Sequence, residues 1–325
     1  MEFRTTLRLE PSRRRLRHSD ELMLIGSCFS DSIGAKLRGA MMLADVNPTG
    51  TVYNPLSIAA TIDRIIDNTP VAGMDLFQQG GVWAHFDFHT RFSMPDKEAT
   101  LQRMNRRIAT AHDRLRTARA LVLTLGTSVV YRLADTGRVV ANCHKVAPAR
   151  FSREMASQRE IVGALNGMLG RLNEFNPGLD VIFTVSPIRH IADGLDRNSL
   201  SKAQLRVAID TVAAGNAQVS YFPAYEIMLD DLRDYRFYAA DMLHPSEVAV
   251  EYIWQAFQAT YFDDRSAQAI ARCERVAKRL AHRPIAASRE TQDRFNADTR
   301  TVARNLLKEY PYLSRIKEIS QLLDL

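Results

Sequence analysis

The sequence is poor in cysteine and has no long apolar run. Its 325 residues contain three cysteines, Cys28, Cys143 and Cys273, too few for the disulfide framework of a small secreted domain. No stretch approaches the roughly 18–20 apolar residues that a membrane-spanning helix needs. Near the N-terminus, Glu2 and Arg4 interrupt any apolar core of a signal peptide. These absences predict a cytoplasmic protein without a membrane span.

The sequence also lacks a strong charge of either sign. It has 43 basic and 37 acidic residues, which gives a net charge of +6. Much of the excess lies in a cluster of arginines near the N-terminus, namely Arg4, Arg8, Arg13, Arg14, Arg15 and Arg17. Because no zinc finger or aromatic-rich RNA-binding pattern accompanies them, we interpret this segment as a solvated surface and expect no nucleic-acid partner.

Short apolar runs of strand type alternate with amphipathic helical patterns along most of the chain. The runs lie at 22–25, 43–46, 121–125, 181–185 and 219–222, and the helical patterns at 56–67, 96–118, 154–173, 200–214, 224–232 and 246–262. This alternation predicts a three-layer α/β/α fold with a mainly parallel sheet.

Two hairpins are expected as insertions in this frame, and one edge strand before it. Weak alternation around Gly80-Gly81 and across 129–141 predicts the hairpins, and residues 3–9 have the pattern of an edge strand. From residue 264 the pattern is helical only and richly charged. We therefore expect an α/β domain over residues 1–263 and a helical C-terminal extension over 264–325.

A strand-to-helix turn near residue 26 places polar side chains where catalysis is favoured. The first apolar run ends at Gly26, and Ser30 or Asp31 can cap the helix that follows. Ser27 and Cys28 then lie near a helix N-terminus, whose free N–H groups stabilise a thiolate, an alkoxide or an oxyanion. The alternative is an ordinary tight turn that opens an α/β domain.

An Asp three residues before a His precedes the helix at 246–262. In this pair, His244 can act as a general base while Asp241 orients its ring. Polar residues also follow the apolar runs, at 126–128 and 186–190. Since active sites lie at the carboxyl ends of parallel strands, we expect these groups to gather at one edge of the sheet.

A metal site is a weaker interpretation of the same residue types. Potential ligands are Cys28, Cys143, His144, His85 and His89, but no Cys-x-x-Cys or His-Glu-x-x-His spacing joins them. The glycines form neither a dinucleotide-binding fingerprint nor a P-loop. We therefore expect no metal and no cofactor.

A set of short motifs gives the region from about residue 22 to 262 a specific signature. They are Gly26-Ser-Cys-Phe-Ser30, Asn47-Pro-Thr-Gly50, Leu125-Gly-Thr127, Asn142-Cys-His-Lys145, Ser186-Pro-Ile-Arg-His190, Tyr235-Arg-Phe-Tyr238 and Asp241-Met-Leu-His-Pro245. Taken in this order, they resemble the GSCFA family, a bacterial family grouped with the SGNH (GDSL-type) hydrolases. The resemblance implies an SGNH-like fold.

The resemblance also implies catalytic roles. A Gly-Asp-Ser-Leu block laid on Gly26-Ser-Cys-Phe29 puts the nucleophile at Cys28, whereas a shift of one residue makes Ser27 the nucleophile. Asp241 and His244 match the Asp-x-x-His block without departure. A helix N-terminus and a nearby imidazolium would both lower the pKa of a thiol. A buried, inert cysteine is the alternative.

Further residues are implied to bind the oxyanion or the substrate. The N–H of Gly50 would face the oxyanion, together with Gly126. Ser128 stands where the Gly-x-Asn block has its asparagine, so Asn142 is a candidate for the missing amide donor. His144 and His190, from two other motifs, complete the set.

These roles predict an acyl-ester hydrolase or acyltransferase that acts on a small molecule or carbohydrate. A non-catalytic ligand-binding module on the same fold is the competing interpretation. The sequence contains nothing that fixes an oligomeric state.

Overall fold

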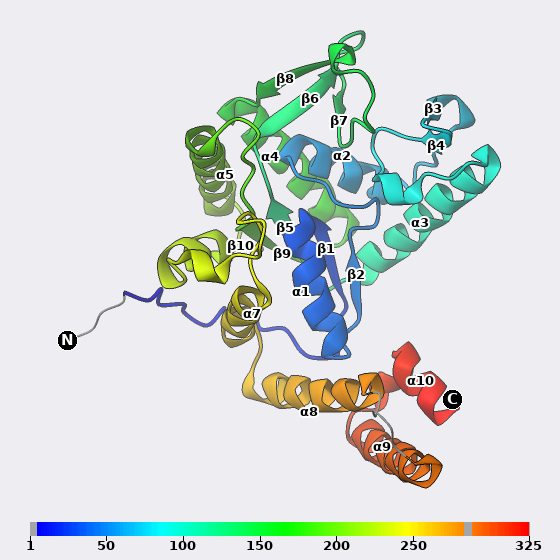
Figure 1. The fold of residues 1–325 in the computed structure, drawn as a ribbon. Coiled ribbons are helices and arrows are strands. Elements are labelled where there is room, and N and C mark those ends of the chain that lie inside the picture. The colour runs from blue at the N-terminus through cyan, green and yellow to red at the C-terminus, as the bar shows by residue number, and fades with distance from the viewer. Residues whose placement is uncertain (1–4, 283–287, 325) are drawn as a thin grey trace.

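A five-stranded parallel sheet forms the centre of the computed structural model, which describes residues 5–282 and 288–324 (Figure 1). The strand order is β10-β9-β5-β1-β2, and all neighbouring strands are parallel. The strands are β1 (Leu22–Gly26), β2 (Ala44–Val46), β5 (Ala120–Leu125), β9 (Asp180–Val185) and β10 (Val219–Tyr221). β1, β5 and β9 are buried along their whole length, which explains why their sequences are apolar almost throughout.

Helices cover both faces of the sheet, which confirms the predicted three-layer α/β/α fold. One layer contains α2 (Pro55–Ile66), α3 (Lys97–Thr117), α4 (Gln158–Phe175) and α5 (Leu195–Ala214), whose apolar side chains form one core cluster together with Met23 and Ile25 of β1. The other contains α1 (Cys28–Gly39) and α7 (Glu247–Tyr261), which pack on Leu22 and Leu24. Alternate residues of β1 therefore supply both halves of the core.

The two inserted hairpins are confirmed, and the second has an additional strand. β3 (Phe77–Gln79) pairs with β4 (Val82–Ala84), and β6 (Val129–Leu133) pairs with β7 (Val139–Val140). β8 (Phe151–Met155) also pairs with β6, so the prediction of a helix from residue 154 was wrong at its start. A capping box of Ser157 and Glu160 begins α4 after β8 ends.

Two other predicted elements differ from the structure. Residues 5–9 form no strand, and residues 3 and 4 of the predicted edge strand lie outside the described residues. The predicted helix at 224–232 consists of the short α6 (Ala224–Glu226) followed by a π-helical segment, Ile227–Asp231.

The C-terminal segment is helical, as expected. It comprises α8 (Asp264–Ala281), α9 (Arg289–Glu309) and α10 (Lys317–Leu323), with a 3₁₀ segment over Pro311–Arg315. Its helices share an apolar cluster that also takes in Met41, from the connection between α1 and β2. The division of the chain after residue 263 stays a prediction, and Met41 ties the extension to the α/β part.

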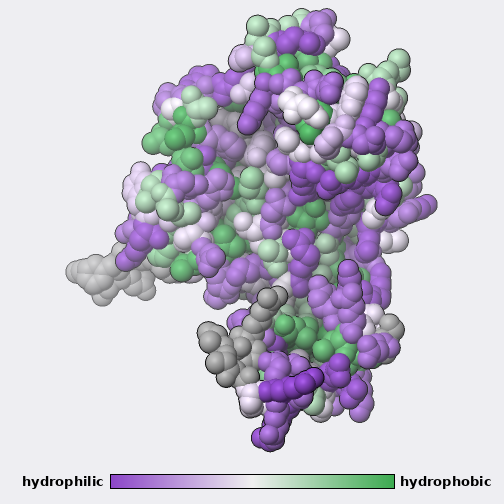
Figure 2. All heavy atoms as spheres, turned by 45° about the vertical axis from the view of Figure 1, so that its right-hand side comes forward, coloured by the Kyte–Doolittle hydropathy of each residue, from purple (hydrophilic) through white to green (hydrophobic). Residues whose placement is uncertain are grey.

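The outer surface is largely polar. Figure 2 shows mainly hydrophilic residues on one face of the molecule, with apolar residues in small groups between them. Among the helices within residues 5–282 and 288–324, none combines the length and the apolar character that crossing a membrane requires.

Candidate active site

The residues after β1 form a tight transition from strand to helix. Gly26 has a φ of +151°, and a Cβ there would lie 2.2 Å from the backbone oxygen of Thr124. Ser27 is the N-cap of α1, so the prediction that Ser30 or Asp31 caps this helix was wrong. Ser27 is fully buried; its Oγ accepts a hydrogen bond from the Phe29 N–H at 3.3 Å and donates one to Ser186 Oγ at 2.9 Å.

Cys28 is the first residue of α1 and lines a pocket of about 400 Å³. It is half-buried, and its Sγ lies 3.5 Å from the hydroxyl of Tyr53. Burial above all, together with Cys28, raises the pKa of Tyr53 to about 12, so this phenol stays protonated at neutral pH. As the first N–H of the helix, the Cys28 amide has no intrahelical acceptor and is available to a ligand.

The topology explains why a pocket forms here. β1 and β5 are neighbours, whereas β2 lies on the outer side of β1 and β9 on the outer side of β5. The chain therefore leaves β1 and β5 in opposite directions. In sheets of this order, ligands bind at that switch point, beyond the carboxyl ends of the strands. Cys28 follows β1, and Thr127, which also lines the pocket, follows β5.

Asp241 and His244 form a self-contained turn. The Asp241 carboxylate accepts hydrogen bonds from the backbone N–H groups of Leu243 (2.9 Å) and His244 (3.0 Å), and it lies 2.6 Å from His244 Nδ1. These bonds, that of the His244 N–H first, lower the pKa of Asp241 to about 2. The carboxylate is therefore charged at neutral pH, and it leaves Nε2 of His244 as the ring nitrogen available for other contacts.

His244 lines the same pocket as Cys28. In the described part of the chain no hydrogen bond joins the two side chains directly. His190 lies in the same lining, with its ring 5.5 Å from that of Tyr53. Its Nε2 is buried without a partner among the described residues. Burial, then the charges of Lys202 and His244, lowers the pKa of His190 to about 4, so the ring is neutral at pH 7.

Two predicted oxyanion residues lie just behind the pocket wall. Gly126 donates its N–H to the carbonyl of Tyr53 at 2.7 Å. Ser128 is fully buried, and both its N–H (2.8 Å) and its Oγ (3.0 Å) are bonded to Ser201, which lines the pocket. Both residues support the lining from within the protein.

The other three predicted oxyanion or substrate residues are not among the residues that line this pocket. The N–H of Gly50 donates to the carbonyl of Asn47 at 2.9 Å, so it is not free to face an oxyanion. Asn142 donates its backbone N–H to the carbonyl of Phe86, and its side-chain Nδ2 is buried without a partner among the described residues. The Nε2 of His144 lies 2.9 Å from the carbonyl of His85. Nor do the potential metal ligands assemble: within the described ranges, no group of three or more His, Cys, Asp or Glu is arranged to hold a metal ion.

Lys202 is a central residue that the sequence analysis did not single out. Its side chain is 1% exposed, and its Nζ donates to the carbonyls of Gly126 and Ser186, both at 2.7 Å. It thus joins the ends of β5 and β9 beneath the pocket. Burial lowers its pKa to about 7. The signal was present, because Lys202 shares the helical spacing of the buried Leu205 and Ile209.

Asn54 is a second such residue. It caps α2, with its Oδ1 accepting from the N–H of Ser57 at 2.8 Å, and it lines the pocket beside Cys28. The two Asn-Pro steps of the 47–55 loop indicated a shaped loop, but not which of its side chains reach the pocket.

Comparison with known proteins gives one family and several distant structures. None of the curated proteins compared matches the chain. Similar solved structures include an acetyl xylan esterase from Butyrivibrio proteoclasticus, with 12% identity and a TM-score of 0.37 over 74% of this chain and 63% of that one. A family 2 carbohydrate esterase from Corynascus thermopiles has 10% identity and a TM-score of 0.37, over 82% and 68%. A family 2 carbohydrate esterase from Clostridium thermocellum, in complex with cellohexaose, has 13% identity and a TM-score of 0.34, over 77% of this chain and 64% of that one.

The chain thus spans less than two thirds of the first of these structures, and at such TM-scores they carry no argument about its activity. The family match covers most of the chain. It extends over residues 21–257, from the start of β1 to within α7, and includes every residue that lines the pocket at Cys28. The chain belongs to the GSCFA family.

Proposed function

We propose that this protein is an acyl-ester hydrolase or acyltransferase acting on a small molecule or carbohydrate, with Cys28 as its nucleophile. The observation that carries the proposal is that Cys28, at the N-terminus of α1, lines the same pocket as His244, whose ring is oriented by Asp241. A thiol, an imidazole and a carboxylate in this relation are the components of nucleophilic acyl transfer.

The surroundings of the two nucleophile candidates favour Cys28 over Ser27. Ser27 Oγ is fully buried, and both its proton and an acceptor site are used within the protein. Cys28 reaches the pocket and lies at a helix N-terminus, which stabilises a thiolate. We therefore assign Ser27 a structural role, as the cap that fixes the start of α1.

The proposed reaction has two halves. His244 Nε2 takes the proton of the Cys28 thiol, and the sulfur attacks the ester carbonyl. The tetrahedral intermediate collapses to a thioester, and the protonated His244 returns the proton to the departing alkoxide. Water or an acceptor alcohol, deprotonated by His244, then attacks the thioester carbonyl. The C–S bond breaks and releases the acid or the new ester, and His244 returns the proton to the departing sulfur of Cys28. Asp241 keeps its charge throughout and holds the ring.

Two groups of the lining support stabilisation of the oxyanion. The first is the backbone N–H of Cys28, which points out of the helix N-terminus. The second is the side-chain amide of Asn54: its oxygen is engaged as the cap of α2, which leaves the NH₂ group as a donor. We propose Asn54 for the role that the sequence analysis gave to Asn142.

Variants at positions 27 and 28 test the proposal. Turnover of a panel of acetyl and aryl esters should be abolished in Cys28→Ala, and iodoacetamide should inactivate the wild type in parallel with labelling of Cys28. Cys143→Ala is the matched control and should keep full activity. Normal turnover by Cys28→Ala, with an inactive but folded Ser27→Ala, would assign the reaction to the serine instead.

A non-catalytic binding module is the second candidate. It is favoured by the absence, within the described chain, of a direct hydrogen bond between Cys28 and His244. Catalytic contacts are often loose without substrate, so this geometry is compatible with both candidates. Saturable binding of an ester with no turnover, in a wild-type protein whose Cys28 reacts no faster than Cys143, would favour the module.

A further inference from the structure

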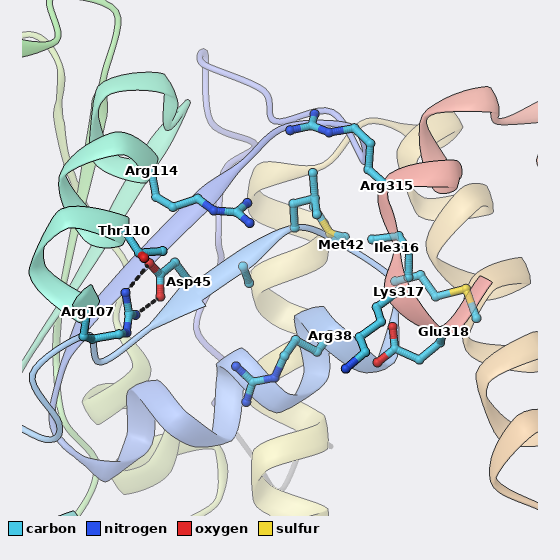
Figure 3. Close-up of a pocket in the computed structure, with 13 residues that line it drawn as sticks. Arg38, Met42, Asp45, Arg107, Thr110, Arg114, Arg315, Ile316, Lys317 and Glu318 are labelled. Atoms are coloured by element: carbon cyan, nitrogen blue, oxygen red, sulfur yellow. Dashed lines mark hydrogen bonds and ion pairs between the residues drawn. The ribbon is translucent and has the colours of Figure 1, made fainter. Parts of the chain in front are cut away.

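A second pocket lies between the edge of the sheet and the C-terminal extension. It has a volume of about 310 Å³ and shares no lining residue with the pocket at Cys28. Its lining comes from α1, the start of β2, α3 and the segment at 315–318, and comprises Arg38, Met41, Met42, Leu43, Ala44, Asp45, Arg107, Thr110, Arg114, Arg315, Ile316, Lys317 and Glu318. Figure 3 shows Arg114 on α3 and Lys317 on α10 extending into the space between these two helices, with Arg38 on α1 bordering it.

Five of these residues are basic and two are acidic, and one acidic residue is already neutralised. The carboxylate of Asp45 accepts hydrogen bonds from both terminal nitrogens of Arg107, one of them at 3.1 Å (Figure 3). Arg315 is paired with Glu21, which lies outside the pocket. Two of the five cations are therefore balanced.

The other three basic residues, from three different helices, have no such partner among the described residues. Within the described part of the chain, no carboxylate lies at ion-pair distance from Arg38, Arg114 or Lys317. Glu318 also lines the pocket but makes no ion pair with them. Cations that line one concave space without matching carboxylates repel one another and raise the local concentration of anions. All three side chains are exposed, and the charge of Arg114 also acts on the nearby carboxylate of Glu21 and, against the effect of burial, helps to lower its pKa.

The floor of the pocket has a different character. Met42 and Ile316 line it with apolar side chains that are otherwise almost fully buried, at 2% and 7% exposure. A ligand that fits this lining carries negative charge at one end and carbon skeleton at the other. Guanidinium groups match phosphate with paired N–H donors. The volume is near the lower end of the range for small-molecule sites.

We propose that this pocket binds a small phosphate ester, with the phosphate held by Arg38, Arg114 and Lys317 and the carbon skeleton lying on Met42 and Ile316. Such a site would give the C-terminal extension a function, since Lys317 and Ile316 lie beyond the 21–257 region matched by the family. A ligand that contacts both parts also holds the extension against the α/β part, and so stabilises the folded chain.

The test uses the full-length wild-type protein with glucose 6-phosphate, inorganic phosphate and glucose as probes in isothermal titration calorimetry. Glucose 6-phosphate should bind, inorganic phosphate should bind more weakly, and glucose should not bind. Arg114→Gln and Lys317→Gln should each weaken binding about tenfold or more, because each removes a charge-assisted contact. Arg106→Gln, on the same helix but outside the lining, is the matched control and should bind like the wild type.

Thermal unfolding separates a binding role from a structural one. Glucose 6-phosphate should raise the melting temperature of the wild type and of Arg106→Gln but not that of Arg114→Gln. Without ligand, Arg114→Gln should be about as stable as the wild type, because Arg114 is exposed and makes no ion pair within the described part of the chain.

Three results would overturn the proposal. They are absence of glucose 6-phosphate binding, an equal loss of affinity in Arg106→Gln, and a clear drop in the stability of unliganded Arg114→Gln. None of these measurements depends on ester turnover, so the site at Cys28 can fail while this one stands.

Discussion

Lys202 allows a quantitative test of how the pocket at Cys28 is supported. Its amine is fully buried with two carbonyls as acceptors, and burial lowers its pKa in the folded chain to about 7, from the ordinary lysine value of 10.5. Between these two values the unfolded chain binds a proton that the folded chain has lost. The free energy of unfolding of the wild type therefore contains a term that rises with pH in this window, by about 3 kcal/mol between pH 7 and 9.5.

The perturbation is Lys202→Met, which keeps the length of the side chain and removes the titrating group. Urea unfolding of both proteins at several pH values between 7 and 9.5 should show the wild type gaining about 3 kcal/mol over the variant across this range. Groups common to both proteins cancel in the difference. Lys308→Met, at an exposed position, should follow the wild type. Parallel curves for the wild type and Lys202→Met would refute the reasoning, because they would mean that the buried amine keeps its proton.

Three further predictions concern the site and its supports. Asp241→Asn and His244→Ala should each reduce ester turnover by orders of magnitude, and the double variant should be little worse than the worse single one, whereas additive losses in kcat/KM would show that the pair does not act as a unit. Between pH 6.5 and 4, His190 is protonated in the unfolded chain but not in the folded one. The wild type should therefore lose up to about 3 kcal/mol of stability relative to His190→Gln as the pH falls through this range. Chemical denaturation of both proteins at pH 7.5 and 4.5 measures this loss, and an equal difference in stability at the two pH values would contradict the prediction. Gly26→Ala should destabilise by about 2 kcal/mol or more, because its methyl group would overlap the backbone of Thr124, whereas Gly39→Ala, with open space around it, should be nearly neutral in the same assay.

The fold was predictable where a local pattern and a tertiary role coincide. The buried strands β1, β5 and β9 are apolar almost throughout, and short apolar runs of this length are typical of strands in a parallel sheet. β8 was missed because three residues of its sequence, Phe151-Ser-Arg-Glu-Met155, are exposed and two of these are charged. Its strand conformation comes from pairing with β6, in which Met155 lies opposite Val129. Such a contact between distant residues leaves no periodic signal in the segment itself.

The candidate site was predictable to a similar degree. Cys28, His190 and His244, each named from the sequence, line one pocket. Gly50 and Asn142 were assigned through motifs alone, and motifs do not reveal which residues reach the pocket, whose lining contains neither of them. The N–H of Gly50 is bonded within its own turn. Lys202 and Asn54 were missed for the opposite reason, because their importance lies in contacts with segments far away in the sequence.

The turn that carries Asp241 and His244 has a consequence for how such a site is assembled. Two backbone N–H groups hold the Asp241 carboxylate, which in turn contacts the His244 ring, and all of these groups lie within residues 241–244. Met242 adopts a left-handed φ of 59° in this turn. The ring and its carboxylate therefore move as one body. The contact between Asp241 and His244 is set within the turn, and the rest of the fold sets the distance from this turn to Cys28. Three backbone hydrogen bonds join the turn to residues outside it, between Ala239 and His244, between Met242 and Ala239, and between Arg189 and Leu243. A small shift in these backbone hydrogen bonds moves His244 toward or away from the Cys28 thiol, without breaking the contact between Asp241 and His244.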